Sequence, residues 1–270
     1  AVRLAGFLAV LALLAAAEAV FPRRRRLVGR LVRWPSNLAI VALDSLVVRV
    51  LFPGAAIGVA LALEGRGLLA LLGIGGAVAV ALGGLLLDLA IYLQHRLFHA
   101  VPLLWRMDRK HQADPDFDVT TGLRFHPGEI VLSLLVKMAV VAAFGIPALA
   151  VLLFEVLLNA TSLFTHANLR LPSWLDAGLR LVLATPDMHR VHHSVLRAET
   201  DSNFGFNLAV WDRLFGTYRP QPAAGHEDMT IGLPIFRDPA ELRLDRLLTQ
   251  PFRDGGSGRV PGSAAGGREG

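Results

Sequence analysis

"AVALGGLLLDLAIYLQHRLFHA", residues 79–100, joins an apolar run to a pair of histidines, and this combination decides the fold. The run extends from residue 67 to residue 92 with Asp88 as its only charged residue, and it is long enough to cross the hydrocarbon core of a bilayer as a helix. His95 and His99 follow at a spacing of four, which places both rings on one helix face where they can bind one ion. The stretch therefore predicts a membrane helix that ends in a metal-binding pair.

The composition is that of a membrane protein. Hydrophobic residues make up 53% of the 270 residues and charged residues only 18%, which is too apolar for an ordinary soluble domain. The chain has no cysteine, so disulfides, thiolate metal sites and cysteine nucleophiles are excluded. The net charge of +5 does not indicate a nucleic-acid partner, because the basic residues cluster beside apolar runs, as membrane topology requires.

Three further apolar stretches accompany this run. Residues 2–21 are long enough to cross a bilayer, with a cleaved signal peptide as the alternative. Residues 37–63 are interrupted by charged residues and a proline, which predicts a kinked or partly interfacial helix. Residues 129–164 are too long for one span, and "GIP" at 145–147 divides them into two helices. We therefore expect an all-α membrane bundle of about four to five apolar helices, with a cytoplasmic helical cap.

The orientation follows from the basic segment "RRRR" at residues 23–26, which the positive-inside rule places in the cytoplasm. The 67–92 run then ends on the cytoplasmic side, and the predicted hairpin returns to that side near His166. Every histidine except His226, which we interpret as a surface residue, is therefore expected near the cytoplasmic face of a bacterial inner membrane.

The chain divides into three parts by composition. Residues 1–166 form the expected transmembrane region with the first two histidine clusters. Residues 167–250 are more polar and form the expected cytoplasmic cap with the third cluster. Residues 254–270 are of low complexity and are expected to be disordered.

Three histidines in five residues give the most specific signal in the chain. They lie in "HRVHH", residues 189–193. His189 and His193 are four residues apart and share a helix face, whereas His192 points slightly aside and can reach a second ion. The alternative is a solvated, pH-sensitive surface patch. Because the chain has nine histidines in 270 residues, we interpret so dense a cluster as a metal-binding box.

An earlier segment matches this box register for register. "MDRKHQA", residues 107–113, aligns with "MHRVHHS", residues 188–194. It keeps the central histidine, His111, but has Asp108 and Gln112 at the two positions where the later segment has histidines. The segment is therefore interpreted as a metal box with two exchanged positions.

Single residues complete the set. His166 lies where the predicted hairpin returns, and His126 lies just before the hairpin begins. Either is also compatible with an ordinary hydrogen-bonding histidine. Asp88 and Gln94 are close to the first histidine pair and are candidates to orient its rings.

Many imidazoles without a thiolate indicate iron, copper, nickel or zinc. A single structural zinc site uses four ligands and leaves several histidines unexplained, whereas two adjacent ions account for them. HExxH, GxSxG and P-loop motifs are absent, which argues against the usual metalloproteases, hydrolases and nucleotide-binding proteins. Bis-histidine haem requires histidines that face each other across helices, rather than three on one short segment.

From Asp88 to Tyr218 the chain resembles the fatty acid hydroxylase / sterol desaturase superfamily of membrane di-iron proteins. The resemblance rests on "DLAIYLQHRLFHAVPLLWR", "DPDFDVTTGLRFHPGE", "LFTHANLRLP", "TPDMHRVHHS" and "DSNFGFNLAVWDRLFGTY". It implies an all-helical membrane fold with a cytoplasmic cap, two iron ions held by histidines, and O2-dependent oxidation of a lipid C–H bond. The reductant is then expected from a separate electron-donor protein of the ferredoxin or cytochrome type.

The resemblance also assigns roles to individual residues. Where the family's second box reads His-x-x-His-His, this chain has Asp108 and Gln112. A carboxylate oxygen can bind iron, whereas an amide is a poor ligand that can hydrogen-bond a water or an imidazole. The expected metal ligands are His95, His99, Asp108, His111, His166, His189, His192 and His193. The candidates for a further ligand or a supporting residue are His126, Gln112 and Asp88.

The expected function is hydroxylation, or desaturation, of a membrane lipid, with hydroxylation preferred on family frequency and no nucleic-acid partner. The alternative is a family member whose altered second box makes it non-catalytic or differently metallated.

Overall fold

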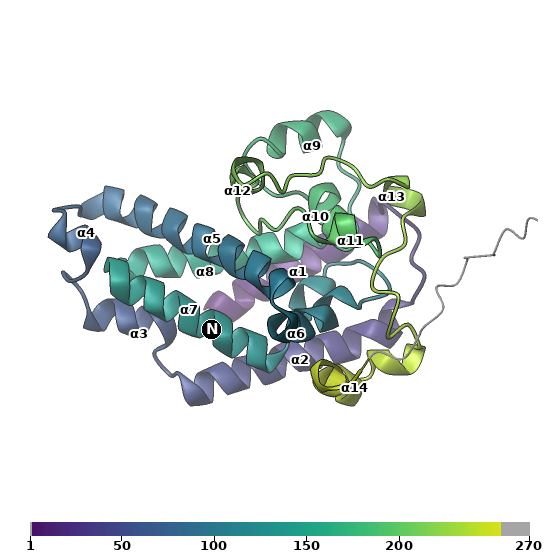
Figure 1. Ribbon diagram of the computed structural model, residues 1–270, viewed down its shortest axis with the longest axis horizontal. Coiled ribbons are helices and arrows are strands. Elements are labelled where there is room, and N and C mark those ends of the chain that lie inside the picture. Colours follow the sequence, from purple (N-terminus) through teal and green to yellow (C-terminus); the bar gives the residue numbers. More distant parts are fainter. Residues whose placement is uncertain (1, 255–270) are drawn as a thin grey trace, which may run out of the picture.

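The computed structural model describes residues 2–254, and this range is helical without a β-strand, so the predicted all-α fold is confirmed (Figure 1). Only isolated β-bridges occur, such as the one between Pro22 and Leu169. The predicted disordered tail, residues 254–270, lies outside the described residues apart from Asp254. The helices are α1 (Val2–Val20), α2 (Arg30–Leu51), α3 (Ala55–Ala62), α4 (Leu68–Leu71), α5 (Gly76–Ala100), α6 (Pro102–Gln112), η1 (Thr121–Leu123), α7 (Pro127–Phe144), α8 (Ala148–Thr165), α9 (Ser173–Leu179), α10 (Pro186–His192), α11 (Arg197–Thr200), α12 (Val210–Leu214), α13 (Gly225–Asp228), η2 (Pro239–Leu242), α14 (Leu244–Thr249) and η3 (Gln250–Phe252).

Four helical segments within the described range are long and apolar enough to cross a membrane, which confirms the predicted membrane bundle. They are α5, α7, α8 and the pair α2–α3, which is counted as one segment over Arg30–Ala62. The interruption predicted in the second stretch falls between α2 and α3, where Phe52 leaves helical geometry before Pro53. The helix α1 is also apolar but shorter over Leu4–Val20.

The break between α7 and α8 falls at the predicted "GIP" segment. Gly145 ends α7 in the left-handed conformation with φ of 67°, which strongly favours glycine. A Cβ atom at Gly145 would also lie 1.7 Å from the carbonyl oxygen of Arg66. A close approach of two loop backbones therefore determines this turn.

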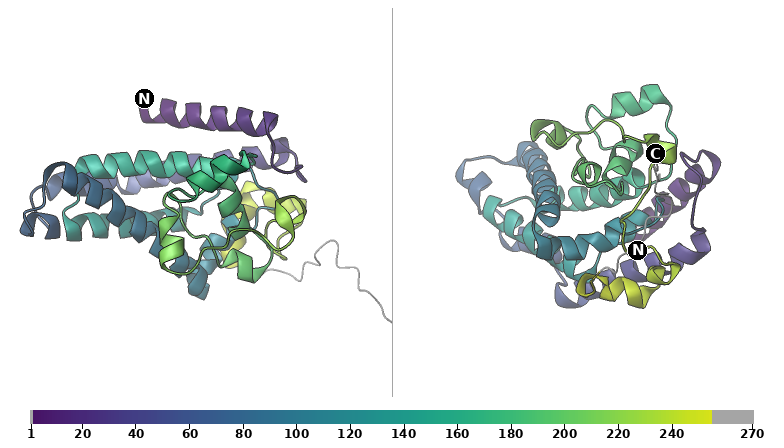
Figure 2. Two further views of the ribbon diagram at one scale, coloured as in Figure 1. Left: turned by 90° about the horizontal axis from the view of Figure 1, so that it is seen from above. Right: turned by 45° about the vertical axis from the view of Figure 1, so that its right-hand side comes forward.

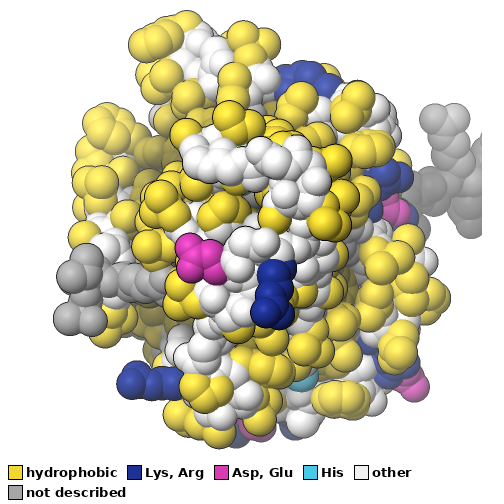
Figure 3. All heavy atoms as spheres, turned by 90° about the vertical axis from the view of Figure 1, so that its left-hand side faces the viewer, with side chains coloured by type: hydrophobic (Ala, Val, Ile, Leu, Met, Phe, Trp, Pro, Cys, Tyr) yellow, Lys and Arg dark blue, Asp and Glu magenta, His cyan; other side chains and the backbone are white. Residues whose placement is uncertain are grey.

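The membrane core forms where α7 and α8 pack against α3 and α5. The buried side chains at this junction include Leu87 and Ile91 of α5, Val141 of α7 and Ala150 of α8. The end of the bundle that carries α3 and α4 presents mostly hydrophobic side chains and few charged ones (Figure 3). This distribution is what a helical bundle in a lipid environment requires.

The segment that joins α1 to α2 lies at the opposite end of the bundle. The buried carboxylate of Glu18 accepts hydrogen bonds from the backbone N–H groups of Val119 and Asn168, at 3.0 and 2.9 Å. Arg24 donates to the carbonyl oxygen of Met229 at 2.8 Å. The predicted basic segment and the last third of the chain therefore meet at this end.

A buried ion-pair network fixes the loop that follows α6. The guanidinium group of Arg33 lies 2.6 Å from carboxylate oxygens of both Asp114 and Asp118, and all three side chains are inaccessible to solvent. Buried charges are tolerated when they are paired in this way. The network holds the chain just after the second histidine segment.

The segment after residue 166 packs around the same end of the bundle (Figures 1 and 2). It supplies α9 to α13 on one side, and α14 and η3 on the side of α2 and α6. All the predicted histidine ligands lie on elements that converge at this end.

Candidate metal centre

The predicted histidine ligands form two groups. Ligand nitrogens within each group lie within 4.8 Å of one another, and every ring is buried. The four-histidine group consists of His111, His166, His189 and His193. The three-histidine group consists of His95, His99 and His192.

The short helix α10 divides its histidines between the two groups. Pro186 occupies its first turn, and the Thr185 hydroxyl accepts from the Met188 N–H to cap its N-terminus. His189 and the following His193 face the four-histidine group, and His192 faces the three-histidine group. The histidines of residues 189–193 therefore divide between the two groups in the way that their helical spacing predicts.

In the four-histidine group, three ring nitrogens converge. The Nε2 atom of His166 lies 3.1 Å from that of His111 and 3.0 Å from that of His189. Nitrogens that bind one ion at about 2.1 Å are separated by roughly this distance. The ring of His111 also stacks on Phe125, with centroids 4.7 Å apart. The arrangement matches a preformed nitrogen donor set.

In the three-histidine group, the outer nitrogen of each ring has a hydrogen-bond acceptor. The Nδ1 atoms of His95 and His192 lie 2.8 Å from the carbonyl oxygens of Phe204 and Ser202. These contacts make Nδ1 the protonated nitrogen and leave Nε2 as the donor atom for a metal. The ring of His99 is oriented in the same way by a carboxylate of the 201–204 segment, at 3.0 Å.

Asp108 and Gln112 both lie at the three-histidine group. A carboxylate oxygen of Asp108 is 3.0 Å from Nε2 of His99, and the side chain is only 1% exposed. The amide nitrogen of Gln112 is 2.6 Å from Nε2 of His192. The two exchanged positions of the second box therefore face the same group.

The two groups are direct neighbours. The rings of His189 and His192, one from each group, stack with centroids 5.1 Å apart. The rings of His192 and His193 are 5.5 Å apart. Two ions held by these groups would be adjacent.

The electrostatics favour cation binding. Burial lowers the pKa of His166 to about 4, and burial together with neighbouring imidazoles lowers the pKa of His193 well below its ordinary value. Burial alone would raise the pKa of Asp108, but the interactions with His99, His95 and Gln112 together outweigh burial and lower the pKa. At neutral pH His166 and His193 are therefore neutral imidazoles, and Asp108 is a carboxylate.

Unsatisfied nitrogens provide a direct test of whether a metal fits. Both ring nitrogens of His193 are buried without a hydrogen-bond partner among the described residues, and so is Nε2 of His95. A buried polar group without a partner costs about 1–3 kcal/mol. A bound metal ion would satisfy one nitrogen of each ring, and imidazole with carboxylate is a donor set that suits iron. The residues present fit a two-metal centre.

Two of the candidate supporting residues lie outside these groups. Nδ1 of His126 accepts from the Gly128 N–H and caps α7, and its Nε2 lies 3.2 Å from the Leu248 carbonyl oxygen. The carboxylate of Asp88 accepts from the side chains of Asn207 and Trp211, at 2.8 and 2.7 Å. The structure thus gives both residues partners other than the metal-binding histidines.

The interpretation of His226 as a surface residue is wrong. Its side chain is only 4% exposed, and its Nε2 lies 3.6 Å from a carboxylate oxygen of Asp187, the second residue of α10. Its Nδ1 lies 3.5 Å from the Arg190 guanidinium group. The loop of residues 220–230 folds back over α10 and covers it, which a polar local sequence does not reveal.

Sequence reasoning assigned no role to the residues that orient the rings. Asp201, Ser202 and Phe204 supply the acceptors for Nδ1 of His99, His192 and His95. They belong to the quoted motif "DSNFGFN", so the motif was visible, but two of the three acceptors are backbone carbonyls that any residue supplies.

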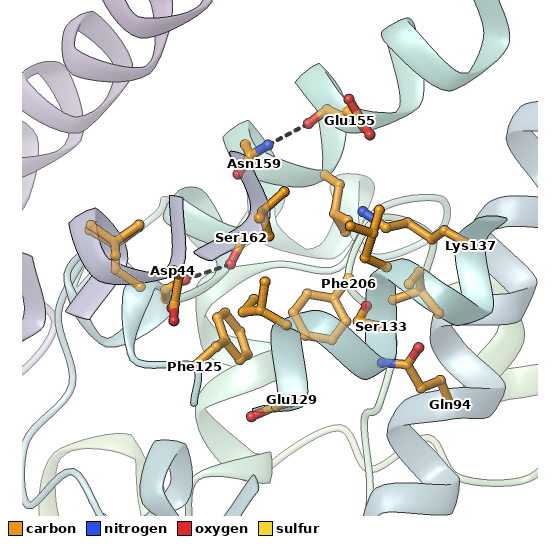
Figure 4. A pocket seen from close by; sticks show the side chains of 18 of the residues that line it. Asp44, Gln94, Phe125, Glu129, Ser133, Lys137, Glu155, Asn159, Ser162 and Phe206 are labelled. Atoms are coloured by element: carbon orange, nitrogen blue, oxygen red, sulfur yellow. Dashed lines mark hydrogen bonds between the residues drawn. The ribbon is translucent and has the colours of Figure 1, made fainter. Parts of the chain in front are cut away.

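A cavity of about 390 Å³ lies among the membrane helices, and His95 of the three-histidine group is one of the residues that line it. Its walls come from α2, α5, α7 and α8, and Phe125 and Phe206 also line it; the ring of Phe206 lies 5.0 Å from that of His95. Figure 4 shows both phenylalanine rings beside the polar side chains of the cavity. The cavity therefore connects the space between the membrane helices with the end that carries the histidine groups.

Comparisons with known proteins agree with this geometry. The chain is 30% identical over 186 residues to ornithine lipid hydroxylase OlsE of Rhizobium tropici, which covers 69% of this chain and 54% of that protein. It is 30% identical over 172 residues to alkylglycerol monooxygenase of Homo sapiens, covering 60% of this chain and 35% of that protein. It is also 30% identical over 159 residues to fatty acid hydroxylase vlmA of a Lecanicillium species, covering 52% and 42%. The chain thus spans about half or less of the length of these relatives, and no solved structure matches it.

The model of the fatty acid hydroxylase family matches residues 80–217. This range contains both groups of histidines, the exchanged residues Asp108 and Gln112, and the acceptors that orient the rings. The chain belongs to the fatty acid hydroxylase family.

Proposed function

We propose that the protein is a membrane-bound di-iron oxygenase that hydroxylates a lipid C–H bond with O2. The observation that carries the proposal is the pair of adjacent buried histidine groups at the end of a cavity between membrane helices. The expected ligands are the seven histidines of the two groups and Asp108. When bound, the irons supply the O2 chemistry that no protein side chain can perform.

The residues of this chain then have three tasks. The carbonyl oxygens of Ser202 and Phe204 and the carboxylate of Asp201 hold the rings of one group in a single tautomer. The cavity positions the lipid next to His95. Burial of both groups keeps bulk water away from the reacting carbon.

Hydroxylation is favoured over desaturation because the relatives reported above are named hydroxylases and monooxygenases. Electrons are proposed to come from a separate protein of the ferredoxin or cytochrome type. The basic segment at residues 23–26 lies at the histidine end, which supports a site that faces the cytoplasm of a bacterial inner membrane. The division into a membrane region, residues 1–166, and a cap, residues 167–250, is part of this proposal.

The test compares membranes that contain the wild type with membranes that contain His192→Ala, both supplied with isotopically labelled O2. We expect the wild type to hold about two irons per chain and to add one labelled oxygen atom to a membrane lipid. His192→Ala is expected to lose iron and the labelled product together. A wild type that holds two irons with a supplied reductant and yields no labelled lipid would refute the proposal.

A second candidate follows from the exchanged positions of the second box. Gln112 stands 2.6 Å from Nε2 of His192, where it competes with a metal for that nitrogen. A protein that binds metal only at the four-histidine group would be a differently metallated family member without oxygenase activity. Metal analysis discriminates, because this candidate requires one ion per chain, or zinc in place of iron.

A further inference from the structure

Polar side chains line the cavity along α7 at helical spacing. Glu129, Ser133 and Lys137 follow one another every four residues, so they share one face of a helix that is otherwise apolar. All three line the cavity, and Figure 4 shows them along one side of it. At 1.5 Å per residue this polar stripe is about 12 Å long.

A second polar stripe lies across the cavity on α8. It consists of Glu155, Asn159 and Ser162, at spacings of four and three residues. Lys137 of the first stripe is within electrostatic reach of Glu155. Polar and charged residues in membrane-spanning helices are costly, and they mark functional sites when they face a cavity. A cavity for a bare hydrocarbon chain would need neither stripe.

Among the described residues that line the cavity, four buried side-chain atoms have no hydrogen-bond partner, and each of them can accept a hydrogen bond; one is Nε2 of His95, assigned above to the metal. Oδ1 of Asp44, Oε1 of Gln94 and Oε2 of Glu129 line this cavity and have no hydrogen-bond partner among the described residues. Asp44 and Glu129 are only 5% and 6% exposed. Buried acceptors without a donor are destabilising, so the cavity is suited to a ligand that brings N–H or O–H groups.

We propose that the cavity binds the head of a polar lipid that carries hydrogen-bond donors, either hydroxyl or ammonium groups. This inference rests on the proposed function, because it names the class of lipid that would be hydroxylated. The head enters between the two stripes and donates to Asp44, Gln94 and Glu129. The exposed residues Ser45 and Asn159 also line the cavity, and they mark its mouth towards the lipid, through which the alkyl chains extend.

The position of the head determines which carbon is oxidised. Gln94 precedes His95 in α5, and both line the cavity. A head held at Gln94 and Glu129 therefore places the first carbons of the lipid beside the three-histidine group. Oxidation is expected close to the head and not at the far end of an alkyl chain.

The first experiment measures lipid binding to purified protein by native mass spectrometry and needs no turnover. The probes are monopalmitoylglycerol with hydroxyl donors, hexadecylamine with an ammonium donor, and methyl palmitate with acceptors only. At least one donor-bearing probe is expected to bind about tenfold or more tightly than methyl palmitate, since one buried hydrogen bond contributes about 1.4 kcal/mol. Equal binding of methyl palmitate would overturn the inference.

Variants test where the lipid head binds and which hydrogen-bond donor of the head is recognised. Gln94→Met removes one acceptor with little change of volume, and we expect it to weaken the preferred probe at least severalfold. Leu93→Met is the matched control, because Leu93 is 45% exposed on the same helix and does not line the cavity. Glu129→Gln keeps an acceptor oxygen but cannot form a carboxylate opposite an ammonium group, so it should weaken hexadecylamine and spare monopalmitoylglycerol. Binding unchanged in both Gln94→Met and Glu129→Gln would contradict the inference.

The second experiment maps the added oxygen in the product by tandem mass spectrometry. Oxygen within the first few carbons from the head supports the inference, and oxygen near the terminal methyl group overturns it. The two proposals fail separately. Head-selective binding without any oxygenated lipid would refute the oxygenase and leave the binding site standing, whereas an oxygenated lipid without head selectivity would refute only the binding site.

Discussion

Replacement of Asp108 by alanine should empty one metal position and leave the other filled. The three-histidine group has three imidazoles and the Asp108 carboxylate, which lies 3.0 Å from Nε2 of His99. Without Asp108 it keeps three imidazole donors and loses its only carboxylate donor. The four-histidine group contains no atom of Asp108 and should be unaffected.

The expected loss of iron follows from the separation of the two histidine groups. Loss of a residue that only supports a ligand commonly lowers metal affinity by roughly 10–100-fold, and loss of a donor should cost at least as much. Asp108→Ala is therefore expected to lower the iron content from about two ions per chain to about one. Asp108→Asn retains one oxygen and should give an intermediate content.

The assay is metal analysis of monodisperse protein after dialysis against a weak chelator. Asp88→Asn is the matched control, because Asp88 is a buried carboxylate of α5 that bonds Asn207 and Trp211 and not a metal-binding histidine. The control should keep both ions. Two ions retained in Asp108→Ala, or both ions lost from it while the protein stays folded, would refute the assignment of Asp108 to one group.

Three further predictions concern other positions. Gln112→His should raise iron retention at the three-histidine group, because the amide of Gln112 already lies 2.6 Å from Nε2 of His192. Lower iron retention in this variant during titration with a chelator would contradict the prediction. Gly122→Ala should lower the metal content of the four-histidine group, because the new Cβ would lie 2.7 Å from the Ser162 carbonyl oxygen, the partner of Nδ1 of His166, and 3.0 Å from that Nδ1. Two retained ions would show that the ring adapts. Burial lowers the pKa of His226 to about 3, so the unfolded state binds more protons and the fold loses stability as pH falls from about 6.5 towards 3. His226→Gln should therefore show a smaller fall in Tm between about pH 7 and pH 5 than the wild type, and an equal fall would exclude this contribution.

Local patterns were sufficient to predict the membrane helices and to single out the seven histidines that the structure brings together in two groups. The lengths of the apolar runs set which segments form membrane helices, and the break at Gly145 follows from the local "GIP" segment. The spacing of His189, His192 and His193 predicts their division between two groups, because the geometry of a helix depends on residues close in sequence.

Other features depend on contacts between distant segments. The partners that orient His95, His99 and His192 come from residues 201–204, about a hundred positions away from the first two rings and ten from the third. The burial of His226 depends on a loop that folds back over α10.

The sequence by itself determined that the chain is a helical membrane protein with clustered histidines, because apolar length and histidine spacing act locally. Only the tertiary structure decided that Asp108 and Gln112 face the same group, that Asp88 and His126 have other partners, and that two polar stripes line one cavity. The polar residues of α7 and α8 are scattered when read along the chain. They face a common cavity because both helices pack against α3 and α5 and leave a space between them.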